Sequence, residues 1–343
     1  MPSKFKKLAQ TLFGFLLAAV FLYLAFRRAN FADLWKSLQD VNYLWVSLLI
    51  PIALISHWLR AVRWAYLLAP VKRDLSVRNL FSAVMIGFMV NNLLPRVGEV
   101  ARAFAIGRTE GISKSSAFGT VVVERIIDML TFLLVLCIIL FLYPTTLDPF
   151  VENVEAVRPF FLAGSVVMLV IFILLFFKGE SLFRLLNVVR PMVPRRYRES
   201  YQRLVDSFLT GFSVTRKHDT FLVIFVLSLL IYSFYALGLY VPFFALGSLA
   251  HHDLNIGASI ILLTISTIAF ALPAPGALGT YHTFLTIALI KLYGVDQTSA
   301  LSYTIITHES GYLVTTVVGL YYFLKDHLKV SDVTLQTVDE KVL

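Results

Sequence analysis

The chain has 343 residues, of which 58% are hydrophobic and only 15% are charged. Soluble domains use about 25% charged residues, so this chain has too few ionisable side chains to solvate a globule of its size. Lysine and arginine outnumber the acids by 30 to 21, a net charge of +9. In so apolar a chain, a basic excess is typical of cytoplasmic loops. These figures argue against a soluble enzyme and a nucleic-acid partner, and they predict a multi-pass membrane protein.

Six apolar segments are long enough to cross about 30 Å of hydrocarbon as helices. These expected spans are residues 8–26, 43–69, 119–143, 159–177, 221–246 and 300–324. Two further apolar stretches, 79–110 and 258–293, are interrupted by Pro and Gly. We expect each of them to be a broken, re-entrant segment that enters and leaves on one side of the membrane. The expected fold class is therefore an all-α polytopic membrane protein.

Loop charge sets the expected orientation. Residues 60–78 carry a net charge of +4, and the amphipathic loop 178–219 carries +5. The positive-inside rule therefore places both in the cytoplasm. The loop 144–158 has a net charge of −2 and suits the outside. These placements agree only if 79–110 is re-entrant, with both termini inside and the short tail 325–343 in the cytoplasm.

The same order of elements occurs twice along the chain. Residues 1–143 contain a span, a span, a broken segment and a span, beginning inside; residues 159–324 repeat this order, beginning outside. Both broken segments contain L-P-x-x-G, starting at Leu94 and at Leu272. The pattern predicts an inverted-topology repeat, an architecture in which transporters bind their substrate between discontinuous helices.

Charged side chains at membrane depth are costly, so they mark candidate site residues. Arg96, Glu99 and Arg102 follow the first break, where a half-helix beginning near Arg96 adds its positive dipole end. The pattern predicts an anion site for a lipid phosphate. As an alternative, Glu99 pairs with both arginines as part of the architecture. Asn91 and Asn92, just before the break, are further candidates for substrate binding.

The next span opens on Glu124, Arg125 and Asp128, and Arg125 and Asp128 are neighbours on one helical face. Such a pair either locks this span against the broken segment or takes part in binding or proton coupling.

Basic residues also close the second span, where His57, Arg60 and Arg63 lie beside Trp58 and Trp64. Tryptophan with arginine at a helix end is typical of the membrane interface, so we expect these residues to be anchors. Arg60 and Arg63 share a face, and contact with a lipid headgroup is the alternative.

In the second half the corresponding places hold Tyr281, His282, His308 and Glu309. A histidine beside a carboxylate predicts a proton relay or a hydrogen bond to phosphate, with a satisfied polar contact as the alternative. The chain has no H-x-x-x-H or H-E-x-x-H spacing, so we expect no metal. It also has no P-loop, G-x-G-x-x-G or G-x-S-x-G motif, so we expect no cofactor and no catalytic residues.

Three segments resemble the membrane domain of lysylphosphatidylglycerol synthases, including stand-alone relatives without the synthase. They are NNLLPRVGEVAR at 91–102, ERIID at 124–128 and PAPGALGT at 273–280. The resemblance covers nearly the whole chain and implies movement of a lipid between leaflets. That lipid is aminoacylated phosphatidylglycerol in the fused proteins, and polyprenyl-phosphate-linked sugars are proposed for some relatives. The resemblance also implies which side chains line or brace the lipid path: Arg96, Glu99, Arg102, Glu124, Arg125 and Asp128.

The chain departs from the family pattern in two ways. His282 stands where many relatives carry an acidic residue, so a role for that carboxylate does not carry over. The tail 325–343 is too short for an aminoacyl-transferring domain, so we expect no synthesis of a modified lipid.

The expected function is therefore a lipid flippase in a bacterial plasma (inner) membrane. Its expected substrate is an anionic or phosphate-bearing membrane lipid: a phospholipid, an aminoacyl-phospholipid or a polyprenyl-phosphate-linked sugar. One alternative is a membrane-bound headgroup transferase with Glu99 or His308 as the base. The other is a non-transporting partner of a lipid-modifying enzyme. Candidate partners are such an enzyme and, in a homo-oligomer, a second copy of the chain.

Overall fold

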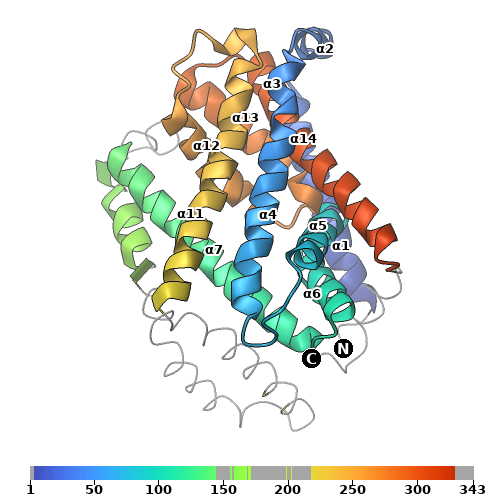
Figure 1. Cartoon of the computed structure of the whole chain (residues 1–343). Helices are drawn as coiled ribbons and strands as arrows, with labels where there is room; N and C mark the ends of the chain where they lie inside the picture. Colours follow the sequence, from blue (N-terminus) through green and yellow to red (C-terminus); the bar gives the residue numbers. More distant parts are fainter. Residues whose placement is uncertain are drawn as a thin grey trace.

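The computed structural model describes residues 4–143 and 218–328, together with 155–156, 158–167, 169–170, 198 and 202. The described part is helical with connecting turns and contains no strand, which confirms the all-α class. Its longer helices are shown in Figure 1. They are α1 (Lys4–Phe26), α2 (Phe31–Gln39), α4 (Leu49–Leu68), α5 (Val77–Leu93), α6 (Gly98–Glu110), α7 (Lys114–Leu142), α11 (His218–Tyr240), α12 (Ile256–Ala271), α13 (Thr280–Tyr293) and α14 (Gln297–Lys325). Short helices are α3 (Tyr43–Ser47), η5 (Val241–Phe244), η6 (Gly247–Leu249) and η7 (Pro275–Ala277).

Three stretches of the described chain are long and apolar enough to cross a membrane. They are Tyr43–Leu68, Lys114–Leu142 and Thr220–Phe244, which coincide with the expected spans 43–69, 119–143 and 221–246. α1 and α2 are bent by 86° relative to each other. If they form one broken span, they are a fourth candidate span. These apolar helices are typical of a membrane protein. The number of six spans stays a prediction.

The remaining predicted segments are described to different extents. The expected span 300–324 lies within α14, and 8–26 lies within α1. Only the first part of 159–177 is described, where 158–167 and 169–170 are helical. Nearly all of the loop 178–219 and most of the tail 325–343 lie outside the described residues.

The first broken segment is a helical hairpin of α5 and α6, interrupted at 94–97. Glu110, at the end of α6, accepts hydrogen bonds from the backbone N–H of Ser76 (3.2 Å) and from Asn79 Nδ2 (2.7 Å). Lys72 Nζ lies 2.8 Å from the same carboxylate. Burial alone would raise the pKa of Glu110, but the hydrogen bonds from Lys72 and Asn79 lower it below its usual range. The start of α5 and the end of α6 therefore lie side by side.

The second broken segment, α12 and α13, also doubles back. His252 Nδ1, just before α12, lies 2.9 Å from the carbonyl oxygen of Tyr293 at the end of α13. The turn between the helices uses positive φ at Gly276 (54°) and Gly279 (79°), where glycine costs least. A Cβ at Gly279 would also lie 2.5 Å from the carbonyl oxygen of Ala18, so this turn packs directly on α1.

The two hairpins begin at opposite ends of the molecule (Figure 1). At one end, the N–H of Asn42, before α3, donates to the carbonyl of Ala245 after η5 (2.9 Å), and the base of the α12–α13 hairpin lies at this end. From there α4 runs to the other end, where Lys72 and Glu110 close the base of the α5–α6 hairpin.

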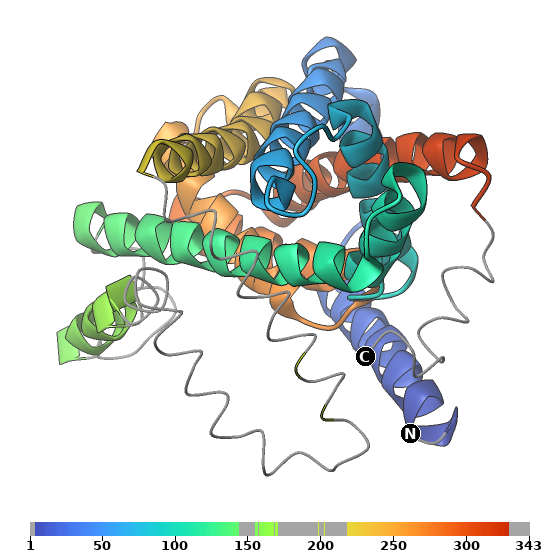
Figure 2. The ribbon, with the colours of Figure 1, turned by 60° about the horizontal axis from the view of Figure 1, so that its bottom comes forward.

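Helices of residues 1–143 pack against helices of the second half, 159–324, in matching pairs. α4 packs along α11, as both views show, while α5 packs on α14 and α12 packs on α7 (Figures 1 and 2). A Cβ at Gly319 of α14 would lie 2.6 Å from the carbonyl oxygen of Met85 on α5, so these helices touch almost backbone to backbone. One apolar core lies mainly among α4–α7 and another mainly among α11–α14.

Candidate anion site

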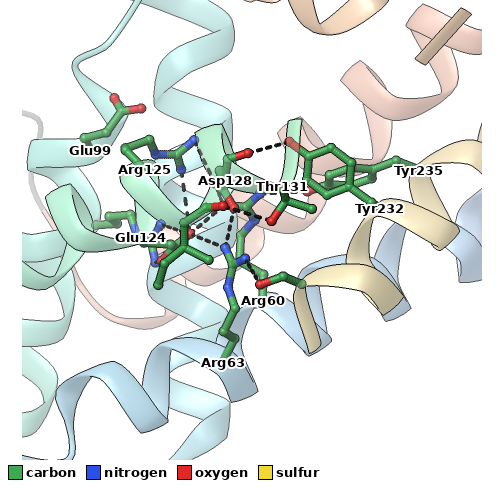
Figure 3. Close-up of polar contacts among 12 residues, drawn as sticks. Arg60, Arg63, Glu99, Glu124, Arg125, Asp128, Thr131, Tyr232 and Tyr235 are labelled. Atoms are coloured by element: carbon green, nitrogen blue, oxygen red, sulfur yellow. Dashed lines mark hydrogen bonds and ion pairs between the residues drawn. The ribbon is translucent and has the colours of Figure 1, made fainter. Parts of the chain in front are cut away.

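Six ionisable side chains from three helices form a cluster, the arginine cluster, inside the fold (Figure 3). Its members are Arg60 and Arg63 of α4, Arg102 of α6, and Glu124, Arg125 and Asp128 of α7. Four guanidinium groups face two carboxylates, so the cluster carries a formal charge of +2.

Glu124 is the centre of the arginine cluster and is fully buried. Arg102 donates to both of its carboxylate oxygens, from Nη1 (3.1 Å) and Nη2 (2.7 Å). Arg60 Nη1 donates a further hydrogen bond to it, and Arg63 Nη2 lies 3.5 Å away. This one carboxylate therefore joins the second half of the α5–α6 hairpin to α4 and α7.

Asp128 completes the pairing of the two α4 arginines. It accepts hydrogen bonds from Arg63 Nη2 (2.6 Å) and Arg60 Nη1 (2.9 Å). The other terminal nitrogens of these arginines donate to α11, to Tyr235 Oη and Ser228 Oγ, each at 2.9 Å. These bonds tie α4, α7 and α11 together and give the buried guanidinium groups the partners that burial requires.

Arg102 is held from its other side by an aromatic ring. Its guanidinium carbon lies 3.9 Å from the ring centroid of Trp64, a cation–π contact. The indole Nε1–H of Trp64 donates in turn to Thr120 Oγ1 (2.9 Å). Arg102 is thus fixed by a bidentate ion pair and a stacked ring.

Arg125 differs from the other three arginines because 44% of its side chain is exposed. Its contacts within the cluster are long, 3.8 Å to Glu124 Oε1 and 3.5 Å to Asp128 Oδ2. The same carboxylates are already neutralised by buried arginines. Arg125 therefore carries charge that the cluster does not compensate.

Arg125 borders a small pocket of about 10 Å³, room for roughly one water molecule, beside the α5–α6 crossing. The pocket is lined by Val84, Gly87, Phe88, Asn91, Gly98, Glu99, Arg102 and Arg125. Glu99 lies apart from the arginine cluster (Figure 3). Its Oε2 has no hydrogen-bond partner within the described part, and its Oε1 has only a long contact of 3.4 Å from Asn91 Nδ2. The pocket thus offers both a cation and a carboxylate.

The other predicted residues of the first half have structural partners. Asn91 Oδ1 accepts the backbone N–H of Gly98 (2.7 Å) and so caps the start of α6. Asn92 Nδ2 donates to Thr315 Oγ1 (3.0 Å) and Thr316 Oγ1 (2.9 Å), which ties α5 to α14. Their role in binding a substrate stays a prediction.

Arg96 connects the two broken segments. Its backbone has φ of 65°, a left-handed conformation that is unusual for a residue other than glycine. Its Nη2 donates to the carbonyl oxygen of Ala271 (3.2 Å), the last residue of α12. A guanidinium at a helix C-terminus also interacts favourably with the helix dipole. The breaks in the two hairpins are therefore neighbours, and Arg96 is not part of the arginine cluster.

The predicted residues of the second half also come together. His308 Nδ1 lies 3.0 Å from Glu309 Oε1, and His282 Nε2 lies 3.8 Å from the same oxygen. Tyr281 packs beside them with its ring centroid 5.0 Å from that of His308, and its hydroxyl donates to Thr307 Oγ1 (3.0 Å). The sequence alone does not establish these contacts, because His282 and His308 lie 26 positions apart along the chain.

Two sequence interpretations of the charged residues are wrong. Arg60 and Arg63 are almost completely buried, so they are not interfacial anchors, and they do not count as loop charges. Arg102 pairs with Glu124 rather than with Glu99. One available signal was the stripe of Ser228, Tyr232 and Tyr235 at helical spacing, which marks a polar face on an uncharged span.

Comparisons with known proteins agree in pointing to one family. Residues 11–319 match the family model described as the lysylphosphatidylglycerol synthase TM region. A UPF0104 membrane protein of Methanothermobacter thermautotrophicus is 25% identical over 307 residues, 84% of this chain and 87% of the relative. A UPF0104 membrane protein of Pyrococcus horikoshii is 24% identical over 311 residues, 84% of this chain and 88% of the relative.

The third relative carries the name of an enzyme. Glycosyltransferase AglD of Haloferax volcanii is 24% identical over 336 residues, which cover 90% of this chain and 53% of the relative. These three relatives are archaeal and lend no support to the expected bacterial origin. No solved structure matches the chain significantly.

Proposed function

We propose that this chain, which belongs to the lysylphosphatidylglycerol synthase TM region family, moves a phosphate-bearing lipid between membrane leaflets. The observation that carries the proposal is the uncompensated charge of Arg125 at a pocket in the α5–α6 hairpin. A charge at membrane depth costs at least about 2.5–3.5 kcal/mol, so a guanidinium held only by two long ion-pair contacts is retained where water or an anion also meets it.

A lipid phosphate suits the half-exposed guanidinium of Arg125 at the mouth of this pocket in charge. A guanidinium binds phosphate through two parallel hydrogen bonds, and the half-exposed Arg125 has terminal nitrogens that are only loosely engaged. Arg102 lies at the pocket as well, but its nitrogens are held by Glu124. We therefore assign the phosphate to Arg125 and a bracing role to Arg102. The pocket is too small for a whole lipid, so the acyl or prenyl chains remain in the bilayer.

The arrangement of the hairpins supports an inverted repeat with alternating access. Each hairpin closes at its own base, through Glu110 in one case and His252 in the other, and the two bases lie at opposite ends. The breaks meet through Arg96 and Ala271. Discontinuous helices that meet between two halves are where transporters place their substrate. We propose six spans with both termini inside, and hairpins that open to opposite faces.

The lipid class remains broad within this proposal. Phospholipids, aminoacyl-phospholipids and polyprenyl-phosphate-linked sugars all carry the phosphate that Arg125 recognises. One relative carries the name of a glycosyltransferase, which favours keeping sugar-bearing lipids among the candidates. A lipid-modifying enzyme and a second copy of the chain remain proposed partners. We expect the chain itself to leave the lipid chemically unchanged.

The test is transport by Arg125→Ala in liposomes with fluorescently labelled phosphatidylglycerol. Hydrogen bonds to charged groups contribute about 1.5–3 kcal/mol, so we expect transport to fall roughly ten- to hundredfold. Arg73→Ala is the matched control, because Arg73 is exposed in the α4–α5 connection and is not among the residues that line the pocket. Equal rates for Arg125→Ala and the parent would refute the phosphate assignment. Mass spectrometry of the lipid before and after the assay separates transport from headgroup transfer, because only a transferase alters the lipid.

A further inference from the structure

The geometry points to a second site, in which His282, His308 and Glu309 bind one divalent transition-metal ion of the zinc class. The site joins α13 to α14 and lies beside the turn that contains Gly276. This metal site does not depend on the lipid transport proposed above.

The three ligand atoms converge on one point. One ligand atom from each of His282, His308 and Glu309 lies within 4.8 Å of the other two. Glu309 Oε1 is 3.0 Å from His308 Nδ1 and 3.8 Å from His282 Nε2. Tetrahedral zinc holds nitrogen and oxygen ligands at about 2.0–2.2 Å, which spaces them roughly 3.3–3.6 Å apart. The separations of 3.0 Å and 3.8 Å lie on either side of this range, and the widest in the group reaches 4.8 Å, so the side chains must close in to seat an ion.

The hydrogen bonding of His308 also favours a cation between it and Glu309. Its Nε2 lies 2.8 Å from the carbonyl oxygen of Gly276, which can only accept, so Nε2 carries the proton. In a neutral ring Nδ1 then presents a lone pair toward the carboxylate of Glu309, where two lone pairs would face each other at 3.0 Å. A metal ion resolves this conflict. A histidine whose other N–H donates to a backbone carbonyl is also the usual arrangement around a metal.

His282 supplies an independent observation. The residue is 2% exposed, and its Nδ1 is buried without a hydrogen-bond partner in the described part. Its Nε2 lies 3.8 Å from Glu309 Oε1, which is too far for a hydrogen bond. A buried imidazole with neither nitrogen engaged is costly. A metal ion at Nε2 engages that nitrogen and leaves the ring proton on Nδ1.

The site is three-coordinate and open on one side. Both histidines are buried, whereas 40% of the Glu309 side chain is exposed. Two neutral imidazoles and one carboxylate leave a divalent ion with a net charge of +1 and a vacant fourth position. Zinc sites with three protein ligands keep such a position for water or an anionic group. The expectation that no metal binds rested on motifs within one helix, whereas these ligands come from two.

The test is metal retention by the full-length chain, purified in mild detergent with a tag that contains no histidine. The protein is stripped with a chelator, dialysed against Zn²⁺ or Co²⁺, and analysed for bound metal and for the visible absorption of tetrahedral Co²⁺. We expect the parent to retain one equivalent and to melt at a higher temperature with metal than without. Glu309→Gln, His308→Gln and His282→Asn should each lose both effects.

His251→Ala is the matched control, because His251 is exposed in the loop before α12 and outside the cluster. It should retain metal as the parent does. X-ray absorption of the Co²⁺-loaded parent should show two imidazole nitrogens and one carboxylate oxygen, a readout that does not depend on any variant folding. A parent that retains no stoichiometric metal, or retention that survives Glu309→Gln, would overturn the site. If the parent retains no metal, the contact between His308 and Glu309 is a hydrogen bond in which the two side chains share a proton.

Discussion

Glu124 is the residue on which the arginine cluster depends. It accepts hydrogen bonds from Arg60 and Arg102, and Arg63 lies within 3.5 Å of it. Removing one partner from a buried ion pair costs more than the pair itself contributes, because the remaining charge has no water to solvate it. Here the loss of one negative charge leaves three buried guanidinium groups with Asp128 alone.

We predict that Glu124→Gln strongly destabilises the protein although it preserves the shape of the side chain. The expected loss is about 3–5 kcal/mol, the usual cost of breaking a buried pair from one side. Thermal melting in mild detergent should show a clear drop, with Asp74→Asn, an exposed acid in the α4–α5 connection, unchanged. If Glu124→Gln has the same melting temperature as the parent protein, the arginine cluster contributes nothing to stability.

Residue pairing was the part of the site that the sequence could not supply. The i,i+3 pair of Arg125 and Asp128 follows from helical geometry and is present at 3.5 Å. Arg60 and Glu124 are 64 positions apart, and Arg63 and Asp128 are 65 apart. No local rule relates such positions. Arginine beside tryptophan describes an interfacial anchor as well as a buried ion pair, so only the packing of α4 on α7 decides between them.

At the scale of elements, the breaks in the helices were predictable and their backbone geometry was not. Pro and Gly located both interruptions correctly, because they remove donors and helical stability wherever they occur. The shared L-P-x-x-G spacing does not give the two turns one conformation. Positive φ occurs at Arg96, the third position of the pattern, in the first turn. In the second turn it occurs at Gly276, the fifth position, and beyond the pattern at Ala277 and Gly279. Contacts with neighbouring helices therefore shape each turn.

The close crossing of α5 and α6 leads to a prediction for Gly98→Ala. A Cβ at this position would lie 1.9 Å from the carbonyl oxygen of Gly87 and 2.6 Å from the Asn91 side chain. The helices must separate, and overpacking of this kind typically costs about 1–3 kcal/mol. Gly311→Ala is the control, since nothing lies within 4 Å of that Cβ in the middle of α14. A Gly98→Ala protein as stable as Gly311→Ala would show that the two helices do not cross so closely.

For the whole molecule, the bases of the two hairpins give a prediction about sidedness. Arg73 and Ser248 are both exposed. Arg73 lies in the α4–α5 connection, and Ser248 lies in η6, three residues after Ala245, whose carbonyl accepts the N–H of Asn42 before α3. We predict that a membrane-impermeant thiol reagent labels Ser248→Cys in intact cells. The same reagent should label Arg73→Cys only after the cells are permeabilised. Cys137, the one cysteine of the chain, is first replaced by serine. Labelling of both positions from the same side would exclude the proposed orientation.

The reciprocal packing of the halves also sets an order for biogenesis. The ribosome completes α5 at Leu93, but α14, the helix on which α5 packs, begins only at Gln297. The newly inserted first hairpin must therefore wait for about 200 further residues to be translated before it reaches its neighbour. The second hairpin meets no such delay, because α7 is already in place when α12 emerges. The packing of α5 on α14 and of α12 on α7 thus gives the first hairpin a long unassembled lifetime and the second hairpin a prompt partner.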